Sequence, residues 1–272
     1  MYGYLACSIV RVTVLESDMP EKLTSIPKRL EMHKFWVEHI PFAFYLVPLL
    51  KPLVMVELGA HGGNSFFAFC QAAKENGLTT KCYAVDTWLG DEHTGYYYDD
   101  IYKDVLKHQR ENYPDNAILM RTTFDEAVLN FKDGSIDLLH IDGLHTYEAV
   151  KHDFETWLPK LSEKAVVLFH DTQIRMKDFG VWKFWDEISK KYPSFEFYHG
   201  CGLGVLAVGM SVPPGVIQFV QDKDKKEEYL RFFKEEGLKV YKLYKQRQIK
   251  RKIMLIFSIH RIIARRIKRM SS

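Results

Sequence analysis

The segment Leu53-Val-Met-Val-Glu57-Leu-Gly-Ala-His-Gly-Gly-Asn-Ser65 joins a short apolar run to a glycine-rich turn. The apolar run is typical of a parallel strand buried on both faces, and the residues after the turn fit a helix. Glycines at positions 59, 62 and 63 allow a tight turn and let a ligand approach the backbone, while the helix start offers free N–H groups. This combination predicts a site for a nucleotide-type ligand.

Four further apolar runs repeat the alternation of strand and helix. We expect strands at 53–57, 81–85, 117–120, 136–141 and 165–169, and helices at 65–76, 102–113, 124–131 and 146–161. Such alternation predicts an α/β fold with a doubly wound, Rossmann-like sheet. The runs 195–199 and 204–209 fit an antiparallel pair that completes the sheet.

Three parts of the chain differ in their pattern. Residues 1–50 predict a mainly helical N-terminal lead-in, because apolar side chains from 28 onward recur at helical spacing. Residues 51–212 hold the alternating strands and helices, and residues 213–272 predict a helical extension with a basic amphipathic tail. A chain of 272 residues with 47% hydrophobic content can bury one full-sized core.

Cysteine usage and targeting signals indicate the compartment. The four cysteines are scattered without the paired spacing of zinc sites, which suits reduced thiols. No uncharged apolar run reaches the roughly 18 residues of a membrane span, and the first residues do not resemble a secretory signal. We therefore expect a cytoplasmic protein.

The net charge of +3 conceals an acidic body and a basic tail. From Gly237 to Ser272 there are 12 Lys and Arg and no Asp or Glu, and subtracting these 12 leaves −9 for the remainder. Between 249 and 269, Ile and Phe recur at three- and four-residue steps, with basic residues on much of the opposite face. Such a helix fits an anionic membrane surface, the acidic body or a protein partner. Nucleic acid is disfavoured, because the rest of the chain is acidic and the tail lacks interleaved aromatic residues.

Two acidic residues near the glycine turn decide between nucleotide cofactors. Asp86 ends the second strand, where a carboxylate can accept hydrogen bonds from both ribose hydroxyls. Glu57 ends the first strand, where it would repel a pyrophosphate but could hold a cationic, amino-acid-bearing cofactor. The glycine spacing also departs from G-x-G-x-x-G. The pattern therefore favours S-adenosylmethionine, although the alternative that the turn is only a tight connection stays open.

Aspartate and histidine residues follow the fourth and fifth strands. Asp142 and His145 come after the strand at 136–141, and His170 and Asp171 after the strand at 165–169. The carboxyl ends of neighbouring parallel strands form the ligand-binding edge of such sheets. The two aspartates offer the oxygen ligands that Mg²⁺ or Mn²⁺ prefers, and His145 is placed as a general base.

A structural alternative exists for this cluster, because the aspartates could cap the following helices and the histidines could be ordinary hydrogen-bonded residues. Two such turns on consecutive strands favour the metal site. His140 is the exception. Strand alternation points it away from the surroundings of Asp142, and we expect it to be structural.

Four motifs resemble those of class I methyltransferases related to macrocin O-methyltransferase and cephalosporin hydroxylase. They are Glu57-Leu-Gly-x-x-x-Gly-x-Ser65, Ala84-Val-Asp-Thr-Trp88, Ile141-Asp-Gly-x-His145-x-Tyr147 and Phe169-His-Asp171. The resemblance covers roughly residues 35–210. It implies the class I fold, S-adenosylmethionine as cofactor, and a setting beside glycosyltransferases of surface-polysaccharide synthesis.

The resemblance also implies roles for single residues. The residues expected to contact the cofactor are Glu57, Gly59, Gly62, Ser65, Asp86, Thr87, Trp88 and Phe124. Asp142 and Asp171 correspond to metal ligands, and Asp142 and His145 to the groups that serve the chemistry. The position before Asp171 is often Glu in that family and is His170 here. His170 is therefore the candidate third ligand, and the identity of the metal stays open.

These expectations lead to a metal-assisted O-methyltransferase that acts on a sugar hydroxyl of a surface glycan or glycosylated metabolite. A cation at Asp142 and Asp171 would lower the pKa of the acceptor hydroxyl, and His145 would take its proton. The aromatic segments Tyr96–Tyr98 and Trp182–Trp185 would form a sugar-stacking wall or belong to the core.

Two other functions stay open. One is a metal-free enzyme in which His145 acts alone. The other is a non-catalytic cofactor-binding module that holds a glycosyltransferase at the inner face of a membrane. The sequence also leaves a homo-oligomer open.

Overall fold

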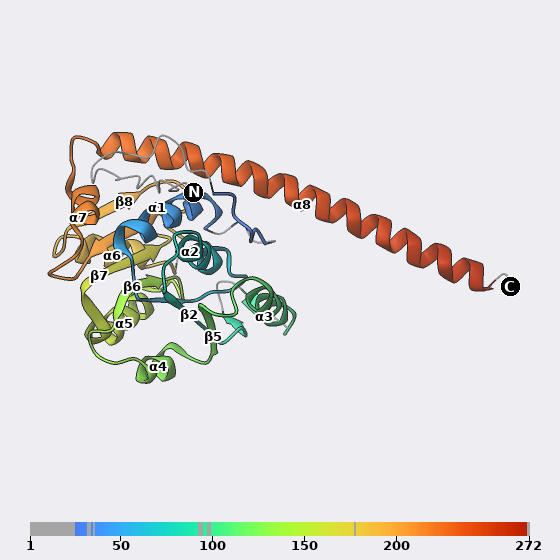
Figure 1. Ribbon diagram of the computed structural model, residues 1–272, viewed down its shortest axis with the longest axis horizontal. Coiled ribbons are helices and arrows are strands. Elements are labelled where there is room, and N and C mark those ends of the chain that lie inside the picture. Colours follow the sequence, from blue (N-terminus) through green and yellow to red (C-terminus); the bar gives the residue numbers. More distant parts are fainter. Residues whose placement is uncertain are drawn as a thin grey trace, which may run out of the picture.

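A computed structural model of the protein describes residues 25–31, 34, 36–91, 95–96, 99–176 and 178–270, with backbone only for Leu255 and 258–270 (Figure 1). Its centre is a seven-stranded sheet of order β5-β2-β1-β6-β7-β9-β8. The strands are β1 (Val54–Leu58), β2 (Lys81–Asp86), β5 (Ala117–Arg121), β6 (Ile136–Ile141), β7 (Leu161–His170), β8 (Ser194–Phe197) and β9 (Leu203–Ala207). A short ribbon pairs β3 (Gly90–Asp91) with β4 (Gly95–Tyr96).

The sheet topology confirms the doubly wound α/β fold. Strands β5, β2, β1, β6 and β7 are parallel, and β9 lies antiparallel between β7 and β8. The antiparallel pair predicted at 195–199 and 204–209 is therefore confirmed. The strand order reverses beside β1 and β6, and open α/β sheets bind ligands at this position, beyond the carboxyl ends of the strands.

Helices cover both faces of the sheet, because alternate strand residues are apolar on both sides. Met55 and Leu138 belong to one buried cluster, whereas their neighbours Val56 and Leu139 belong to the other. The first face carries α1 (Ile40–Leu50), α2 (Asn64–Glu75), α3 (Asp100–Asn112), α7 (Pro214–Gln221) and the start of α8 (Lys226–Met270). The second carries α4 (Phe124–Ala127), α5 (Tyr147–Trp157) and α6 (Val181–Ile188).

The N-terminal lead-in is helical over only part of its described length. Residues 25–31 form no helix, and a 3-10 turn at Val37–His39 leads into α1. Trp36 has a φ of 64°, a left-handed conformation that reverses the chain just before this turn. The helical spacing seen from residue 28 is therefore wrong for 28–31. Residues 1–24, 32–33 and Phe35 of the predicted lead-in lie outside the described residues.

Three predicted elements differ in length from the observed ones. The helix predicted over 124–131 is an α-helix only to Ala127 and continues as a 3-10 turn at Val128–Asn130. The helix predicted over 146–161 ends at Trp157 and continues as a 3-10 turn, because Pro159 has no backbone N–H for a further helical hydrogen bond. The strand predicted at 165–169 begins at Leu161, which pairs with Ile136 of β6 before a register shift. The other four parallel strands agree with the prediction within one residue.

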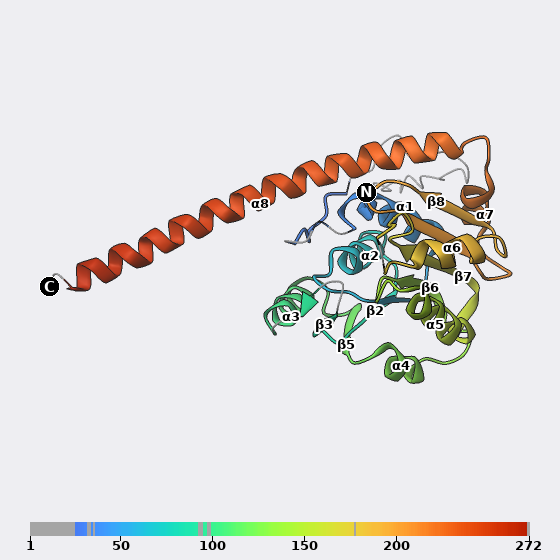
Figure 2. The same ribbon diagram turned by 180° about the vertical axis from the view of Figure 1, so that it is seen from behind.

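Helix α8 spans 45 residues and extends past the body of the molecule (Figure 2). Its first half is anchored, because Tyr229, Phe233 and Tyr244 are buried against the body. Beyond Arg251 the described side chains Ile253 and Phe257 are exposed. Among the described residues, no helix combines the length and the apolar composition that crossing a bilayer requires.

Candidate functional site

The turn after β1 packs directly against the turn after β6. Gly59 has a φ of 91°, and a Cβ at this position would lie 2.1 Å from the backbone carbonyl oxygen of Asp142. Glycine alone satisfies both the conformation and the contact. The Asp142 N–H also donates to the Leu58 carbonyl at 2.9 Å. The two turns therefore form one backbone unit at the carboxyl edge of the sheet.

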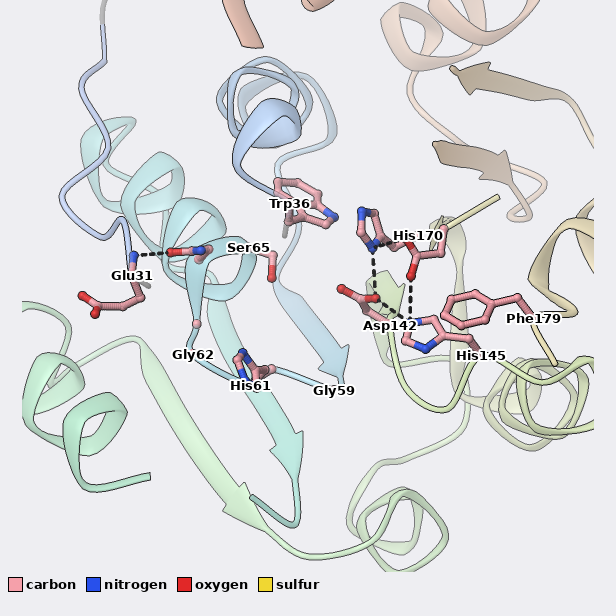
Figure 3. Close-up of a pocket in the computed structure, with 14 residues that line it drawn as sticks. Glu31, Trp36, Gly59, His61, Gly62, Ser65, Asp142, His145, His170 and Phe179 are labelled. Carbon is pink, nitrogen blue, oxygen red and sulfur yellow. Dashed lines mark hydrogen bonds and ion pairs between the residues drawn. The ribbon is translucent and has the colours of Figure 1, made fainter. Parts of the chain in front are cut away.

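Two cavities of about 240 Å³ each open at this edge. Gly59, Gly62 and Ser65, which the sequence places at the cofactor, line the first cavity (Figure 3). Asp86, Thr87 and Phe124 line the second cavity. Both cavities share the lining residues Gly59, His61 and Asp142, so they adjoin at the packed turns.

Asp86, at the end of β2, fixes the glycine turn through both carboxylate oxygens. Its Oδ2 accepts a hydrogen bond from the His61 N–H at 2.8 Å, and its Oδ1 accepts one from the Trp88 N–H at 2.6 Å. Each carboxylate oxygen has a second lone pair. Asp86 can therefore hold the turn and also accept hydrogen bonds from ribose hydroxyls in the second cavity.

Two residues predicted to contact the cofactor line neither cavity. Trp88 is fully buried: its indole N–H donates to the His61 carbonyl at 2.8 Å, and its ring packs on Tyr102 with centroids 4.9 Å apart. Glu57 is also fully buried and accepts a hydrogen bond from the Ser65 hydroxyl at 2.5 Å. Both side chains hold residues of the cavity wall, Glu57 through Ser65 and Trp88 through His61.

Glu57 continues into a buried chain of polar groups. Burial raises the pKa of Glu57, while the nearby His140 imidazole and the hydrogen bond from the Ser65 hydroxyl lower this pKa in part. His140 Nε2 accepts a hydrogen bond from the Trp36 indole N–H at 3.0 Å, so a neutral His140 carries its proton on Nδ1. That Nδ1 lies 3.6 Å from Glu57 Oε2. His140 is thus a fully buried link between Glu57 and Trp36, in a structural position.

The predicted cluster of Asp142, His145, His170 and Asp171 converges in the first cavity (Figure 3). His145 Nε2 lies 3.0 Å from Asp171 Oδ2 and 3.5 Å from Asp142 Oδ1. His170 Nδ1 lies 3.1 Å from Asp142 Oδ1 and 3.4 Å from Asp171 Oδ1. The four side chains are at most 15% exposed, so little water separates their charges.

The two carboxylates determine the protonation of both histidines. Burial lowers the pKa of His145, but hydrogen bonds and charges from Asp142 and Asp171 outweigh burial and raise this pKa to about 10. Burial likewise lowers the pKa of His170, and the same carboxylates raise it to about 9. Burial raises the pKa of Asp142, yet His170 and His145 hold it well below its ordinary value. The cluster therefore consists of carboxylates that require cationic neighbours.

The donor atoms of Asp142, His170 and Asp171 fit a bound divalent cation, because they all lie within 4.8 Å of one another. His170 Nε2 lies 3.2 Å from the Gly200 carbonyl oxygen, so Nε2 carries a proton and a neutral ring presents its Nδ1 lone pair to the carboxylates. Metal-binding histidines commonly donate their second N–H to a carbonyl in this way. Asp171 also has a φ of 61°, a strained backbone of the kind found at functional sites.

Several residues of the first cavity carry no signal in the sequence analysis. Phe179 stacks on His145 with ring centroids 4.9 Å apart, and Trp36 forms another part of the wall. Phe179 lies in a segment without a periodic pattern, and the helical spacing that includes Trp36 predicts packing on the core and not a cavity wall. Glu31 is held by Asn64, whose Oδ1 accepts the Glu31 N–H at 2.8 Å. Of these four residues, Asn64 alone could have been predicted at the cavity, because it belongs to the glycine-rich turn.

The predicted sugar-stacking wall does not line either cavity over its described residues. Trp185 is buried in the core against Gly204, and Trp182 packs beneath Arg175 while its indole N–H donates to the Phe179 carbonyl. Tyr96 is exposed on β4. Tyr97 and Tyr98 lie outside the described residues.

Residues 56–172 match the family model described as a methyltransferase domain. This part of the chain is therefore similar to methyltransferase domains. The matched stretch begins in β1 and ends just after β7. It therefore contains the glycine turn, Asp86 and the whole histidine and aspartate cluster.

Solved structures share the fold of this chain over about two thirds of its length. A putative caffeoyl-CoA O-methyltransferase from Staphylococcus aureus is 13% identical with a TM-score of 0.51, over 63% of this chain and 83% of that chain. The cofactor-bound protein Rv0187 from MTB is 13% identical with a TM-score of 0.50, over 66% of this chain and 84% of that chain. At such identity the likeness establishes the Rossmann-like fold alone.

One relative is similar over more of the chain than the family model covers. The uncharacterized protein y4gI of Sinorhizobium fredii is 45% identical over 210 residues, which is 76% of this chain and 23% of that protein. The chain thus spans less than a quarter of the length of this relative.

Proposed function

We propose that this chain transfers the methyl group of S-adenosylmethionine to a hydroxyl oxygen, with Mg²⁺ or Mn²⁺ held by Asp142, His170 and Asp171. One observation carries the proposal. Asp142 lines both cavities and touches Gly59, so a carboxylate of the metal cluster borders the cofactor cavity. Methyl transfer requires this adjacency, because the acceptor oxygen must lie in line with the methyl group.

The cofactor would be divided between the two cavities. Asp86, Thr87 and Phe124 in the second cavity provide a carboxylate for the ribose and an aromatic ring for the adenine. Gly59 and Ser65 border the first cavity beside the N-terminus of α2, whose N–H groups suit the methionine carboxylate. The bound cofactor supplies an activated methyl group, so alignment and deprotonation are the tasks of the protein.

A bound divalent cation would lower the pKa of a hydroxyl that it coordinates. Asp142 and Asp171 would hold it through oxygen atoms and His170 through Nδ1, with Gly200 fixing the His170 ring. The imidazole ligand favours Mn²⁺ over the harder Mg²⁺. The carboxylates by themselves keep His145 protonated at neutral pH, because they raise its pKa to about 10.

His145 can therefore accept a proton only when another cation takes over the charges of Asp142 and Asp171. This argument favours metal-assisted transfer over a metal-free reaction in which His145 acts alone.

We propose a sugar hydroxyl as the acceptor. The resemblance to macrocin-type methyltransferases supports this choice. The first cavity also offers the aromatic rings of Trp36 and Phe179 together with a few polar groups, a combination typical of specific ligand pockets. A glycosyltransferase that builds the acceptor is the corresponding partner.

Calorimetry on the purified chain tests the cofactor and the metal separately. Asp86→Asn should weaken S-adenosylmethionine binding by about tenfold to a hundredfold, because hydrogen bonds to a charged group are lost. Asp115→Asn is the matched control. Asp115 is an exposed carboxylate just before β5, and this variant should bind S-adenosylmethionine normally. Asp171→Asn should weaken Mn²⁺ binding while leaving cofactor binding near the wild-type value.

Turnover distinguishes the enzyme from the non-catalytic module. We expect methyl transfer to glycan acceptors that a chelator abolishes and Mn²⁺ restores. Turnover that persists in the presence of the chelator would refute the requirement for a metal. It would favour the metal-free reaction in which His145 acts as the base. Absence of S-adenosylmethionine binding under every condition would refute the proposed function as a whole.

A further inference from the structure

We propose that the second half of α8 docks on an anionic lipid surface. The docking face is the outer stripe, defined as Ile249, Ile253, Ile256 and Phe257. These apolar side chains lie where α8 has left the body, and between 46% and 65% of each is exposed. Apolar side chains of this size are normally buried, so their clustering on one helix requires a partner.

On the opposite side of the same helical turns, three side chains of α8 contact the body. Arg247 donates to the Lys28 carbonyl at 3.2 Å, and Gln248 donates to the Glu31 carbonyl at 3.1 Å. Arg251 binds both carboxylate oxygens of Glu31, at 3.0 and 2.9 Å. These three side chains therefore fix which side of α8 faces the protein.

Helical geometry places the outer stripe away from that side. At about 100° of rotation per residue, Ile249, Ile253, Ile256 and Phe257 fall within a sector of roughly 100°. Arg247, Gln248 and Arg251 fall in a second sector about 180° away. The outer stripe is thus not a continuation of the packing of Phe233 and Tyr244 on the body. It lies on the side of α8 away from these contacts, on the part of the helix that extends past the folded domain (Figures 1 and 2).

Charge identifies the partner as anionic. Residues 250–269 contain eight Lys and Arg and no Asp or Glu. The exposed Lys242 and Lys245 precede Ile249 on the same outward face. The sequence continues the three- and four-residue steps to Ile263 and Ile267. An apolar stripe with basic residues around it and no acidic residue is the pattern of a helix that lies in the interface of an anionic bilayer.

A second copy of this chain is a poorer partner. Helices that pair through such a stripe rely on opposite charges beside it, and like charges repel. From Gly237 onward the chain has no acidic residue that could pair with the basic ones of another copy. Pairing of two outer stripes would bring two uncompensated basic helices together.

Vesicle sedimentation with the full chain tests the proposal. We expect binding to vesicles of phosphatidylcholine and phosphatidylglycerol in equal parts, no binding to phosphatidylcholine alone, and weaker binding at higher salt. Phe257→Asp should reduce vesicle binding by at least about tenfold, because the variant loses the ring that would be buried in the bilayer. Met254→Asp is the matched control. It adds the same charge at a side chain of nearly equal exposure, 63% against 65%, but outside the outer stripe.

The outcomes separate the partners. Equal losses in the Phe257 and Met254 variants would refute insertion of the outer stripe. Failure of the wild-type chain to bind anionic vesicles would overturn the proposal. A dimer in sedimentation velocity that Phe257→Asp disrupts, without vesicle binding, would assign the stripe to a second copy. Circular dichroism and S-adenosylmethionine binding on the same samples verify that folding and the proposed activity are unaffected.

Discussion

Asp153 on α5 links the stability of the fold to pH. It is 6% exposed and approaches the turn after β6, where a Cβ on Gly143 would lie 3.5 Å from its Oδ2. Burial raises the pKa of Asp153 from 3.8 to about 7, His152 lowers it in part, and Asp125 raises it further. A group with a raised pKa in the folded state contributes stability at low pH, and that stability is lost as pH rises through the folded pKa.

The size of this loss follows from the two pKa values. The interval from 3.8 to about 7 corresponds to about 4 kcal/mol at 1.36 kcal/mol per pH unit. Asp153→Asn keeps the shape of the protonated acid and cannot ionise. The variant should therefore match the wild type near pH 4 and exceed its free energy of unfolding by up to about 4 kcal/mol near pH 8.

Urea denaturation at a series of pH values measures the difference between the two proteins. Glu155→Gln, an equivalent change at an exposed position of the same helix, is the control and should change stability by less than about 0.5 kcal/mol at every pH. A difference between Asp153→Asn and the wild type that does not vary with pH would refute the reasoning. So would a variant that is less stable than the wild type near pH 8.

Two further predictions concern the turn and the core. Gly59→Ala should lower the melting temperature and reduce S-adenosylmethionine binding at least about tenfold, because its Cβ would lie 2.1 Å from the Asp142 carbonyl oxygen. Normal binding by calorimetry would show that the turn has room to move. Phe42→Ala should cost about 3–5 kcal/mol in urea denaturation, because Phe42 is buried among Phe219, Phe233 and neighbouring rings. A cost below about 1 kcal/mol would place α1 outside the cooperative core.

The sheet was predictable because its strands are continuous apolar runs that end in polar residues. β6 matches the predicted range 136–141 at both ends. The cluster followed from topology, since neighbouring parallel strands end at one edge and their next residues meet there. His145 and Asp171 are 26 positions apart in the sequence, yet their side chains lie 3.0 Å apart.

The remainder depends on long-range packing that no local pattern carries. Phe179 reaches the first cavity from an irregular segment. Trp36 belongs to a helical apolar pattern, but its left-handed backbone just before the 3-10 turn directs it to the cavity. Trp88 follows a motif that predicts cofactor contact, but its large ring is buried on Tyr102. The direction of a side chain after a strand depends on the local backbone, and Trp88 has a φ of 52°. The switch of the apolar stripe on α8 from the body to the outside is likewise visible only against the folded domain.

The contact between Gly59 and Asp142 makes the two turns a single mechanical element. In the proposed enzyme, a displacement of the glycine turn by the cofactor would therefore reach Asp142, the proposed ligand of the cation. Any such coupling is reciprocal. If the cofactor changes the affinity for the cation by some factor, the cation changes the affinity for the cofactor by the same factor. Under the proposed function, loading of the site would be a linked equilibrium, in which the concentration of one ligand sets the apparent dissociation constant of the other.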